Sequence, residues 1–481
     1  MLHTDPIVAA FDALGRRDPS ALLATSGSRR ATAAGIDALA RAAARALLEA
    51  RPEPGEPVGL IAANGPGFLA GLIACRRAGH PTALLHPAAA PGEIDRAVAA
   101  FGLQAILRAA SRWPRGGSGF RVQRRRPPAD PAGRPPAGTA IIKMTSGSTG
   151  APRGVSVTAQ ALLADDAALR RAMGIGRDDR LLAVVPFSHS YGLSSLVLPA
   201  ITSGVTLVLP SSDHPLAPLR AATRHAATVL PTAPAWIAAI LRLSEAPPWP
   251  ASLRLVIAAG APLRPDTAAD FRAIHGRPIH SFYGATECGG ICYDPIGEAT
   301  LRGLVGSPLP GVEVALADVE GEGPSAAKRV VVRSAAVGLA ILPRPDPHLS
   351  GGRFISSDLA SWSGPDLRLE GRLDDRINFR GHKIDPIEVE QAIAGLAGVE
   401  EVVVHGLPDG RGDTARLRAV VSAPGGTVTA PGVIAWCRDR LAGYKVPRSV
   451  LIVPSMPRTA RGKIDRRLAT RLAADGGGAH D

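Results

Sequence analysis

Short runs of apolar residues recur along the chain, each followed by a segment with helical spacing. The clearest runs lie at residues 58–63, 81–85, 253–258 and 278–282. A strand that is apolar throughout needs cover on both faces, which a parallel sheet flanked by helices provides. We therefore predict an α/β protein built on parallel sheets that are covered on both sides.

The pattern changes near residues 371–375, and a second, smaller unit follows. Its segments alternate as helix, strand, strand, helix and strand, at residues 386–396, 401–405, 416–421, 431–441 and 450–453. This order predicts a compact α+β domain over residues 374–481, behind a large N-terminal domain over residues 1–373.

A proline-rich stretch at residues 124–139 carries the most compact run of basic residues, Arg124, Arg125 and Arg126. Proline disfavours a helix or a central strand there, so we predict an exposed connection. The chain has 55 Lys and Arg against 42 Asp and Glu. A nucleic-acid or membrane-surface partner would suit this charge, but the basic residues are scattered, and a solvated loop is the favoured interpretation.

Cysteine content and the N-terminus bear on the compartment. Four cysteines in 481 residues cannot form a disulfide scaffold. The first residues include Asp5 and Asp12, which a signal peptide would not carry at those places. No continuous apolar span of about 20 residues is visible. We expect a soluble, cytoplasmic protein that binds neither membrane nor nucleic acid.

The first segment that indicates chemistry is Thr145-Ser-Gly-Ser-Thr-Gly-Ala-Pro-Arg-Gly154, directly after an apolar run. Glycines allow close approach of the backbone to a ligand, and exposed N–H groups with several hydroxyls suit phosphate oxygens. A nucleotide-binding loop and a simple turn between strands both fit this pattern. The segment is not a common P-loop, because no lysine is followed by a hydroxyl residue.

Three further segments carry polar residues at positions suited to a nucleotide. Phe282-Tyr-Gly-Ala-Thr-Glu287 follows a predicted parallel strand, and open α/β sheets bind ligands at that end of the strands. Asp358 could accept both ribose hydroxyls, with Arg372 in support. Lys463 lies behind a glycine in a basic segment, as a point charge for phosphate or carboxylate. Taken singly, each segment is better explained by a turn, a surface salt bridge or a solvated basic patch.

The order and spacing of the four segments resemble the adenylate-forming superfamily, which includes acyl- and aryl-CoA synthetases, luciferases and the adenylation domains of peptide synthetases. The resemblance extends from Val58 to Lys463 and includes LRLVIAAGAPL at residues 253–263. It implies a large N-terminal domain of fused α/β subdomains with a β-barrel-like piece, and a small, mobile C-terminal domain that rotates at a hinge.

The resemblance also implies roles for individual residues. The β- and γ-phosphates of ATP would be bound by Thr145, Ser146, Gly147, Ser148, Thr149, Gly150 and Arg153. Adenine would lie beside Gly260, Ala261 and Pro262, with Tyr283 stacked on it and Gly284 next in the chain. Thr286 would contact the α-phosphate, Glu287 would bind Mg²⁺, and Asp358 with Arg372 would bind the ribose. Lys463 would bridge the substrate carboxylate and the α-phosphate, Asp374 would be the hinge, and Gly381 would border the path of a pantetheine thiol.

The implied reaction has two steps. A carboxylate oxygen attacks the α-phosphorus of ATP and expels pyrophosphate, and a thiol then attacks the mixed anhydride. Two anions must meet in the first step, so a preorganised cation such as Lys463 would contribute strongly. We expect an AMP-forming acid–thiol ligase of fatty- or aromatic-acid metabolism, with CoA as the leading acceptor and the phosphopantetheine arm of an acyl carrier protein as the alternative.

The resemblance defines the carboxylic acid substrate less well than the reaction. Pro186-Phe-Ser-His-Ser-Tyr-Gly192 resembles the histidine-bearing segment of acyl- and aryl-CoA ligases and lacks the Asp-x-Ser pattern that holds an amino group. This favours a carboxylic acid without an α-amine, although His189 also fits a packed core histidine. The expected pocket residues are His189, Trp236, Ala259, Ala285, Gly289 and Gly290.

Other classes are less well supported. Cys288 and Cys292 are four residues apart, but no second ligand pair suggests zinc. No G-x-S-x-G segment supports a serine hydrolase. A non-catalytic nucleotide-binding homologue stays open, because Arg153 and Ser357 replace the lysine and glycine usual in the superfamily. A monomer and a homodimer fit equally.

Overall fold

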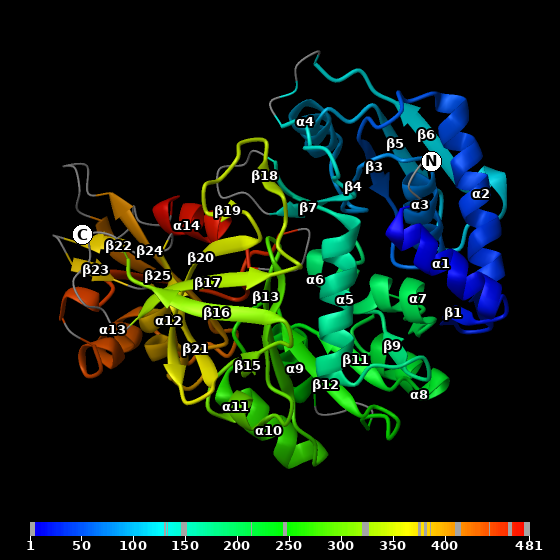
Figure 1. The fold of residues 1–481 in the computed structure, drawn as a ribbon. Helices are drawn as coiled ribbons and strands as arrows, with labels where there is room; N and C mark the ends of the chain where they lie inside the picture. Colours follow the sequence, from blue (N-terminus) through cyan, green and yellow to red (C-terminus); the bar gives the residue numbers. More distant parts are fainter. Residues whose placement is uncertain are drawn as a thin grey trace. The chain divides into compact units, whose positions relative to one another are not determined.

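The computed structural model describes residues 5–128, 131, 133–145, 152–212, 214–243, 248–319, 327–373, 377–379, 382–384, 386–408, 415–441, 443–459 and 464–475. The chain forms two compact units (Figure 1). Unit 1 comprises Met1–Ala315, Val331–Ser356 and Trp362–Arg368, and unit 2 comprises Leu316–Val330, Ser357–Ser361 and Leu369–Asp481. The domain boundary at residue 374 stays a prediction, because Asp374 lies outside the described residues.

Unit 1 contains a seven-stranded sheet, with its parallel strands in the middle and antiparallel pairs at the edges. Its order is β18-β8-β7-β4-β3-β5-β6, with bounds Ala340–Leu342, Arg153–Val157, Ile141–Thr145, Thr82–Leu85, Val58–Ile61, Ala105–Ala109 and Phe120–Arg124. Helix α4 (Pro91–Phe101) packs on the face that bears Ile61 and Ile106. Helix α3 (Pro66–Arg77) approaches Leu60 and Leu107 on the other face through Gly71. The prediction of a parallel sheet covered on both faces is confirmed here.

Unit 1 also contains a nine-stranded sheet, whose central strands β1, β10, β9, β11, β12 and β13 are parallel. Its order is β15-β14-β13-β12-β11-β9-β10-β1-β2, with bounds Ser307–Pro308, Gly289–Tyr293, His280–Ala285, Leu255–Ala259, Val229–Thr232, Arg180–Leu182, Thr206–Val208, Leu22–Ser26 and Arg29–Thr32. Helices α8 (Ala217–His225), α9 (Pro234–Leu241) and α10 (Pro265–His275) share one hydrophobic cluster with this sheet.

Three of the remaining helices of unit 1, α1, α2 and α5, begin at side-chain caps. Asp5 accepts the N–H groups of Ile7 and Val8 at the start of α1, and threonines cap α2 and α5. Helix α5 contacts strand β14, and Figure 1 draws it in front of the nine-stranded sheet. The bounds are α1 Pro6–Arg17, α2 Ala33–Ala50, α5 Ala159–Met173, α6 Ser190–Gly192, the π-helical η2 Leu193–Val197, α7 Leu198–Ser203, α11 Glu298–Leu301 and the 3₁₀ turn η1 Gly117–Gly119.

A five-stranded sheet follows, and the boundary between the two units runs through its strands. Its order is β16-β17-β20-β19 with β21 paired to β20, and its bounds are Val312–Ala317, Lys328–Ser334, Arg353–Ser363, Leu349–Ser350 and Asp366–Arg372. This sheet stands where a β-barrel-like piece is expected. Its described strands form an open sheet and do not close into a barrel.

Most predicted elements appear within a few residues of their expected bounds, and one difference has a clear cause. The apolar run at residues 181–185 predicts a strand of that length, but strand β9 (Arg180–Leu182) ends at Leu182. The Asn64 amide donates to the carbonyls of Ala183 and Val185, so a side chain takes hydrogen bonds that a strand neighbour would otherwise supply. The described part of the stretch at residues 124–139 contains no helix or strand after Arg124, as predicted.

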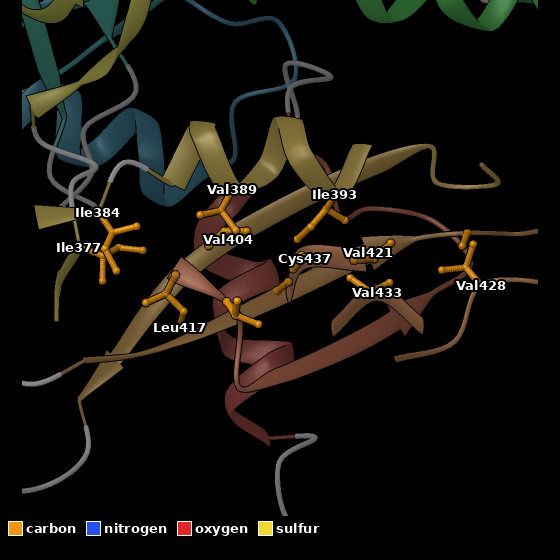
Figure 2. Close-up of a cluster of buried hydrophobic side chains, with 13 residues drawn as sticks. Ile377, Ile384, Val389, Ile393, Val404, Leu417, Val421, Val428, Val433 and Cys437 are labelled. Carbon is orange, nitrogen blue, oxygen red and sulfur yellow. The ribbon is translucent and has the colours of Figure 1, made fainter. Parts of the chain in front are cut away.

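The C-terminal part of unit 2 forms its own hydrophobic core. Its three-stranded sheet has the order β24-β25-β26, with bounds Glu401–Pro408, Ala415–Ser422 and Ser449–Val453. The hairpin of β22 (Ile377–Phe379) and β23 (His382–Ile384) precedes this sheet. The helices are α12 Pro386–Ala394, α13 Ala430–Arg438, α14 Arg466–Asp475 and the 3₁₀ turn η4 Gly443–Lys445. Figure 2 shows Val389 and Ile393 of α12 pointing toward Val404 and Val421 of the sheet. The expected α+β character is confirmed.

His405 of strand β24 is a partly buried histidine beside two arginines. Neither ring nitrogen has a hydrogen-bond partner within the described structure. Burial, together with Arg418 and Arg466, lowers the pKa of His405 to about 4. The unfolded chain, with a histidine pKa near 6.5, therefore binds more protons between these two values, and the free energy of unfolding falls as the pH falls through this range.

Between pH 7 and pH 4.5 we expect the free energy of unfolding to fall by about 1–2 kcal/mol less in His405→Gln than in the native chain, after allowance for solvent screening. Chemical denaturation at both pH values measures it. His214→Gln, which changes an exposed histidine, is the control and should keep the native pH dependence. Equal pH dependence in all three proteins would contradict the interpretation.

No helix within the described residues combines the length and apolar character that a membrane span needs.

Candidate active site

The predicted phosphate loop connects the antiparallel strands β7 and β8. Thr145 pairs with Arg153 at the open end of this hairpin, and the Thr145 hydroxyl donates to the Arg153 carbonyl at 3.4 Å. The loop residues Ser146, Gly147, Ser148, Thr149 and Gly150 lie outside the described residues. Strand pairing therefore fixes the two residues that flank the loop.

The Arg153 side chain forms an ion pair with Asp346, at 3.6 Å between Nη2 and Oδ2. The Arg153 side chain is 44% exposed and the Asp346 side chain 28%. The N–H of His348 donates to Asp346 Oδ1 at 3.0 Å and holds this carboxylate in place. The arginine that replaces the expected lysine thus has a counter-ion in unit 1.

The carboxyl ends of strands β12 and β13 carry the residues expected at adenine and at the metal. Gly260, Ala261 and Pro262 follow β12 and are exposed, and Ala259 before them is buried. Gly260 has φ +84°, a conformation that glycine adopts without strain. These residues stand where an open α/β sheet binds a ligand, because strands β12 and β13 are parallel neighbours.

Strand β13 ends in the Tyr-Gly-Ala segment that precedes Thr286 and Glu287. Tyr283 is 8% exposed, so most of its ring is already covered, and Gly284 is exposed. Ala285, Thr286 and Glu287 are partly exposed. The Glu287 carbonyl accepts the N–H of Gly338 at 2.8 Å, which fixes the backbone beside the partly exposed carboxylate.

A buried carboxylate supports the two glycines expected in the acyl pocket. Asp165 of α5 accepts the N–H of Gly290 at 2.9 Å and the hydroxyl of Ser194 at 2.6 Å. A Cβ atom on Gly289 would lie 2.5–2.8 Å from the Asp165 carboxyl group. Asp165 therefore joins the Gly289–Gly290 backbone to η2, the helix that follows the His189 segment.

We expect Gly289→Ala to lower the free energy of unfolding by about 3 kcal/mol, because the new methyl group overlaps the Asp165 carboxylate in addition to the backbone strain at φ +74°. Gly311→Ala is a matched control, since Gly311 has φ +80° and open space around its Cβ position. It should lose about 1 kcal/mol, from backbone strain alone. Thermal and chemical denaturation measure both. Equal losses would contradict the close approach to Asp165.

Lys143 lies in β7, two residues before Thr145, and is 1% exposed. Burial lowers the pKa of Lys143, and the negative charges of Asp165 and Glu287 act in the opposite direction. The thiol of Cys288 lies in the same electrostatic neighbourhood, and burial raises its pKa well above the ordinary value. The buried Lys143 amine thus interacts electrostatically with Asp165 and with the Glu287–Cys288 segment.

The His189 segment is held by an asparagine from another strand end. The N–H of Phe187 donates to the Asn64 side chain at 2.8 Å. A Cβ atom on Gly192 would lie 2.0 Å from the Pro186 carbonyl oxygen, so this turn requires glycine. His189 is partly buried and precedes the short helix α6. The structure thus brings the His189 segment and the two pocket glycines together through Asp165 and Ser194.

Trp236 has a different environment. Its indole N–H donates to the Pro215 carbonyl at 3.3 Å, and its ring meets that of Trp249 at 6.0 Å between centroids. It packs against the hydrophobic cluster of α8–α10. These contacts explain Trp236 as part of the helix–sheet core, and its role in the pocket stays a prediction.

In unit 2, Asp358 and Arg372 lie together as expected. Their ion pair measures 3.4 Å, with side chains 16% and 50% exposed. The hinge residue Asp374, the glycine Gly381 and the lysine Lys463 lie outside the described residues.

Residues of this site that are absent from the sequence-based set include Asn64, Lys143, Asp165 and Asp346. Asn64 follows the apolar run of β3, and a polar residue at the end of a predicted strand could have been recognised as a candidate site residue. Lys143 interrupts an apolar strand directly before the phosphate loop, which was a second signal. Asp165 carried none, because a helical aspartate is ordinarily a solvated residue.

Comparison with known families decides the assignment. The family model described as AMP-binding enzyme matches residues 11–337. The model described as AMP-binding enzyme C-terminal domain matches residues 388–463. The chain belongs to the AMP-binding enzyme family. Its two matched regions agree with the order of a large N-terminal part and a small C-terminal part.

Relatives and solved structures of AMP-binding enzymes agree with this assignment. The chain is 31% identical over 473 residues to a feruloyl-CoA synthase from Amycolatopsis, which covers 93% of this chain and 95% of that protein. Its fold is similar to ATP-bound MatB from Rhodopseudomonas palustris, with TM-score 0.84, 22% identity and coverage of 98% and 100%. The amide bond synthetase McbA from Marinactinospora thermotolerans gives TM-score 0.80 at 27% identity, with coverage of 97% and 99%. The predicted superfamily and fold class are thereby confirmed.

The described residues contain no group of three or more histidine, cysteine, aspartate or glutamate side chains that could hold a metal ion. Magnesium in phosphoryl-transfer sites typically uses one or two carboxylates together with substrate phosphates. The partly exposed Glu287 fits that mode as a single carboxylate.

Proposed function

We propose that this AMP-binding enzyme is an ATP-dependent acid–thiol ligase that activates a carboxylic acid as its acyl-adenylate and transfers the acyl group to CoA. The similarity to feruloyl-CoA synthase over 93% of the chain carries the proposal. An oxalate–CoA ligase and a long-chain-fatty-acid–CoA ligase are also relatives, at 29% identity. These proteins share a ligase reaction and differ in the acid, so the acid class is a separate question.

The proposed residue roles are those that the resemblance to the adenylate-forming superfamily implies. Thr145, Arg153 and the loop between them would hold the β- and γ-phosphates, with adenine beside Gly260–Pro262 and Tyr283 and the α-phosphate at Thr286. Mg²⁺ bound at Glu287 would neutralise phosphate charge. Asp358 would accept the ribose hydroxyls, with its carboxylate oriented by Arg372.

The remaining roles concern the reacting groups. Lys463 would bring its ammonium to the point where the substrate carboxylate oxygen attacks the α-phosphorus, which lowers the repulsion between two anions. A rotation at Asp374 would then present Gly381 to the thiol path. The acid would lie against His189, Ala259, Ala285, Gly289 and Gly290.

ATP–pyrophosphate exchange over a panel of acids tests the first step. The panel should include phenylpropenoic, indoleacetic, long-chain and dicarboxylic acids, because relatives act on these classes by name. We expect exchange with at least one of them. Exchange with none would favour a non-catalytic homologue.

Product analysis with free CoA, a holo acyl carrier protein and a simple amine then identifies the acceptor. We expect an acyl-CoA. Acyl transfer only to the carrier protein or only to the amine would replace CoA as the acceptor and leave the adenylation step in place.

A further inference from the structure

Arg153 and Asp346 come together because two strand pairs meet at the phosphate-loop hairpin. Strand β8 pairs with β7 on one side, where Arg153 faces Thr145. It pairs with β18 on the other side, where Gly154 faces Leu342. The chain that leaves β18 therefore passes the end of the hairpin, and Asp346 lies four residues beyond Leu342.

The Asp346 carboxylate is held in a fixed place. Its Oδ1 accepts the N–H of His348 at 3.0 Å, and its own carbonyl accepts the N–H of Leu349 at 3.0 Å. Its Oδ2 faces Arg153 Nη2 at 3.6 Å. Both side chains are partly exposed, so a ligand can reach them and solvent screens them only in part.

We propose that Asp346 is the counter-ion of Arg153 in the nucleotide-free protein and sets the affinity for ATP, the triphosphate taking over the guanidinium when it binds. The inference rests on the proposed function, which assigns Arg153 to the phosphates. Arginine suits such an exchange, because its planar group carries five N–H donors and can turn from a carboxylate to a phosphate without losing charge.

The direction of the effect follows from electrostatics. Asp346 places a negative charge beside the proposed phosphate site, and ATP itself carries several negative charges. Asp346 is also paired with the Arg153 guanidinium that would bind the triphosphate. Its removal therefore strengthens ATP binding. For charges about 5–8 Å apart in partly exposed surroundings, the change corresponds to about 3–10-fold in affinity.

The test measures the Kd of MgATP by isothermal titration calorimetry, which requires no acid and no turnover. We expect Asp346→Asn to lower the Kd about 3–10-fold at low ionic strength, and the gain to shrink in 0.5 M salt. Asp95→Asn is the matched control, since Asp95 forms an exposed ion pair with Arg125 at 3.2 Å. It should leave the Kd unchanged.

A double substitution shows whether Asp346 acts through Arg153. Arg153→Gln should weaken binding, and the gain from Asp346→Asn should fall below about twofold in that background. An unchanged or higher Kd in Asp346→Asn, or an equal gain in both backgrounds, would overturn the proposal.

The two proposals can fail separately. Normal MgATP binding without pyrophosphate exchange for any acid would remove the ligase function, and the Asp346 comparison would still be decided by the Kd values. Exchange with an unaltered Kd in Asp346→Asn would remove only the counter-ion role. A native chain that binds no MgATP would overturn both.

Discussion

Lys463→Ala is expected to slow acyl-adenylate formation by at least about 10²-fold, the loss typical of removing one preorganised donor from a site of developing charge. The reason is the charge of the reactants, because a carboxylate must approach a phosphate that is itself negative. In the proposed role, the ammonium of Lys463 would lower this repulsion at the reacting atoms. Pyrophosphate exchange and single-turnover formation of the adenylate both measure the loss.

The second half-reaction separates the role of Lys463 from a general loss of structure. Synthetic acyl-adenylate supplied to Lys463→Ala should still pass its acyl group to CoA, since two anions no longer have to meet at the phosphorus. Lys328→Ala is the control. It removes an exposed lysine that pairs with Asp318 at 2.8 Å and should leave both steps intact. Normal exchange by Lys463→Ala would remove this residue from the mechanism.

Lys143→Met is expected to lower the free energy of unfolding by about 3 kcal/mol, because it removes the amine that interacts electrostatically with the buried Asp165 carboxyl group. Asp165 keeps hydrogen bonds from Gly290 and Ser194, but these do not replace a full charge. Lys328→Met, at an exposed ion pair, should change stability by less than about 0.5 kcal/mol. Chemical denaturation measures both variants.

A double substitution identifies the partner of Lys143. Asp165→Asn keeps the size of the side chain and can still accept the Gly290 N–H, so Lys143→Met with Asp165→Asn removes both charges together. We expect the double variant to recover more than half of the loss seen in Lys143→Met. Strictly additive losses would show that Lys143 and Asp165 are not a coupled pair.

These two expectations come from different levels of description. The role of Lys463 follows from a motif and the chemistry of its reaction, and needs no coordinates. The role of Lys143 appears only in three dimensions, because strand β7, helix α5 and the Glu287 segment are far apart in the chain and meet in the core.

Local patterns identified the elements well for a physical reason. Runs such as Val58–Ile61 and Thr82–Leu85 are buried at every residue, so their apolar character is visible in the sequence without knowledge of their neighbours. Residues 66–77, between two of these runs, have helical spacing and begin at a proline, and they form helix α3 (Pro66–Arg77). The pairing of β8 with both β7 and β18 could not be predicted, because strand partners depend on contacts between distant segments.

The amino-acid sequence alone determined the α/β class and the two-part organisation, and it predicted four segments at a nucleotide. Apolar periodicity, glycine placement and motif order can be read from the chain without knowledge of its tertiary contacts. Tertiary structure decided which side chains surround those segments. It placed Asp346 on Arg153, Asn64 on the backbone before His189, and Asp165 against Gly289. These contacts depend on strand pairing and helix packing between segments that a linear sequence leaves apart, so only the folded chain brings them together.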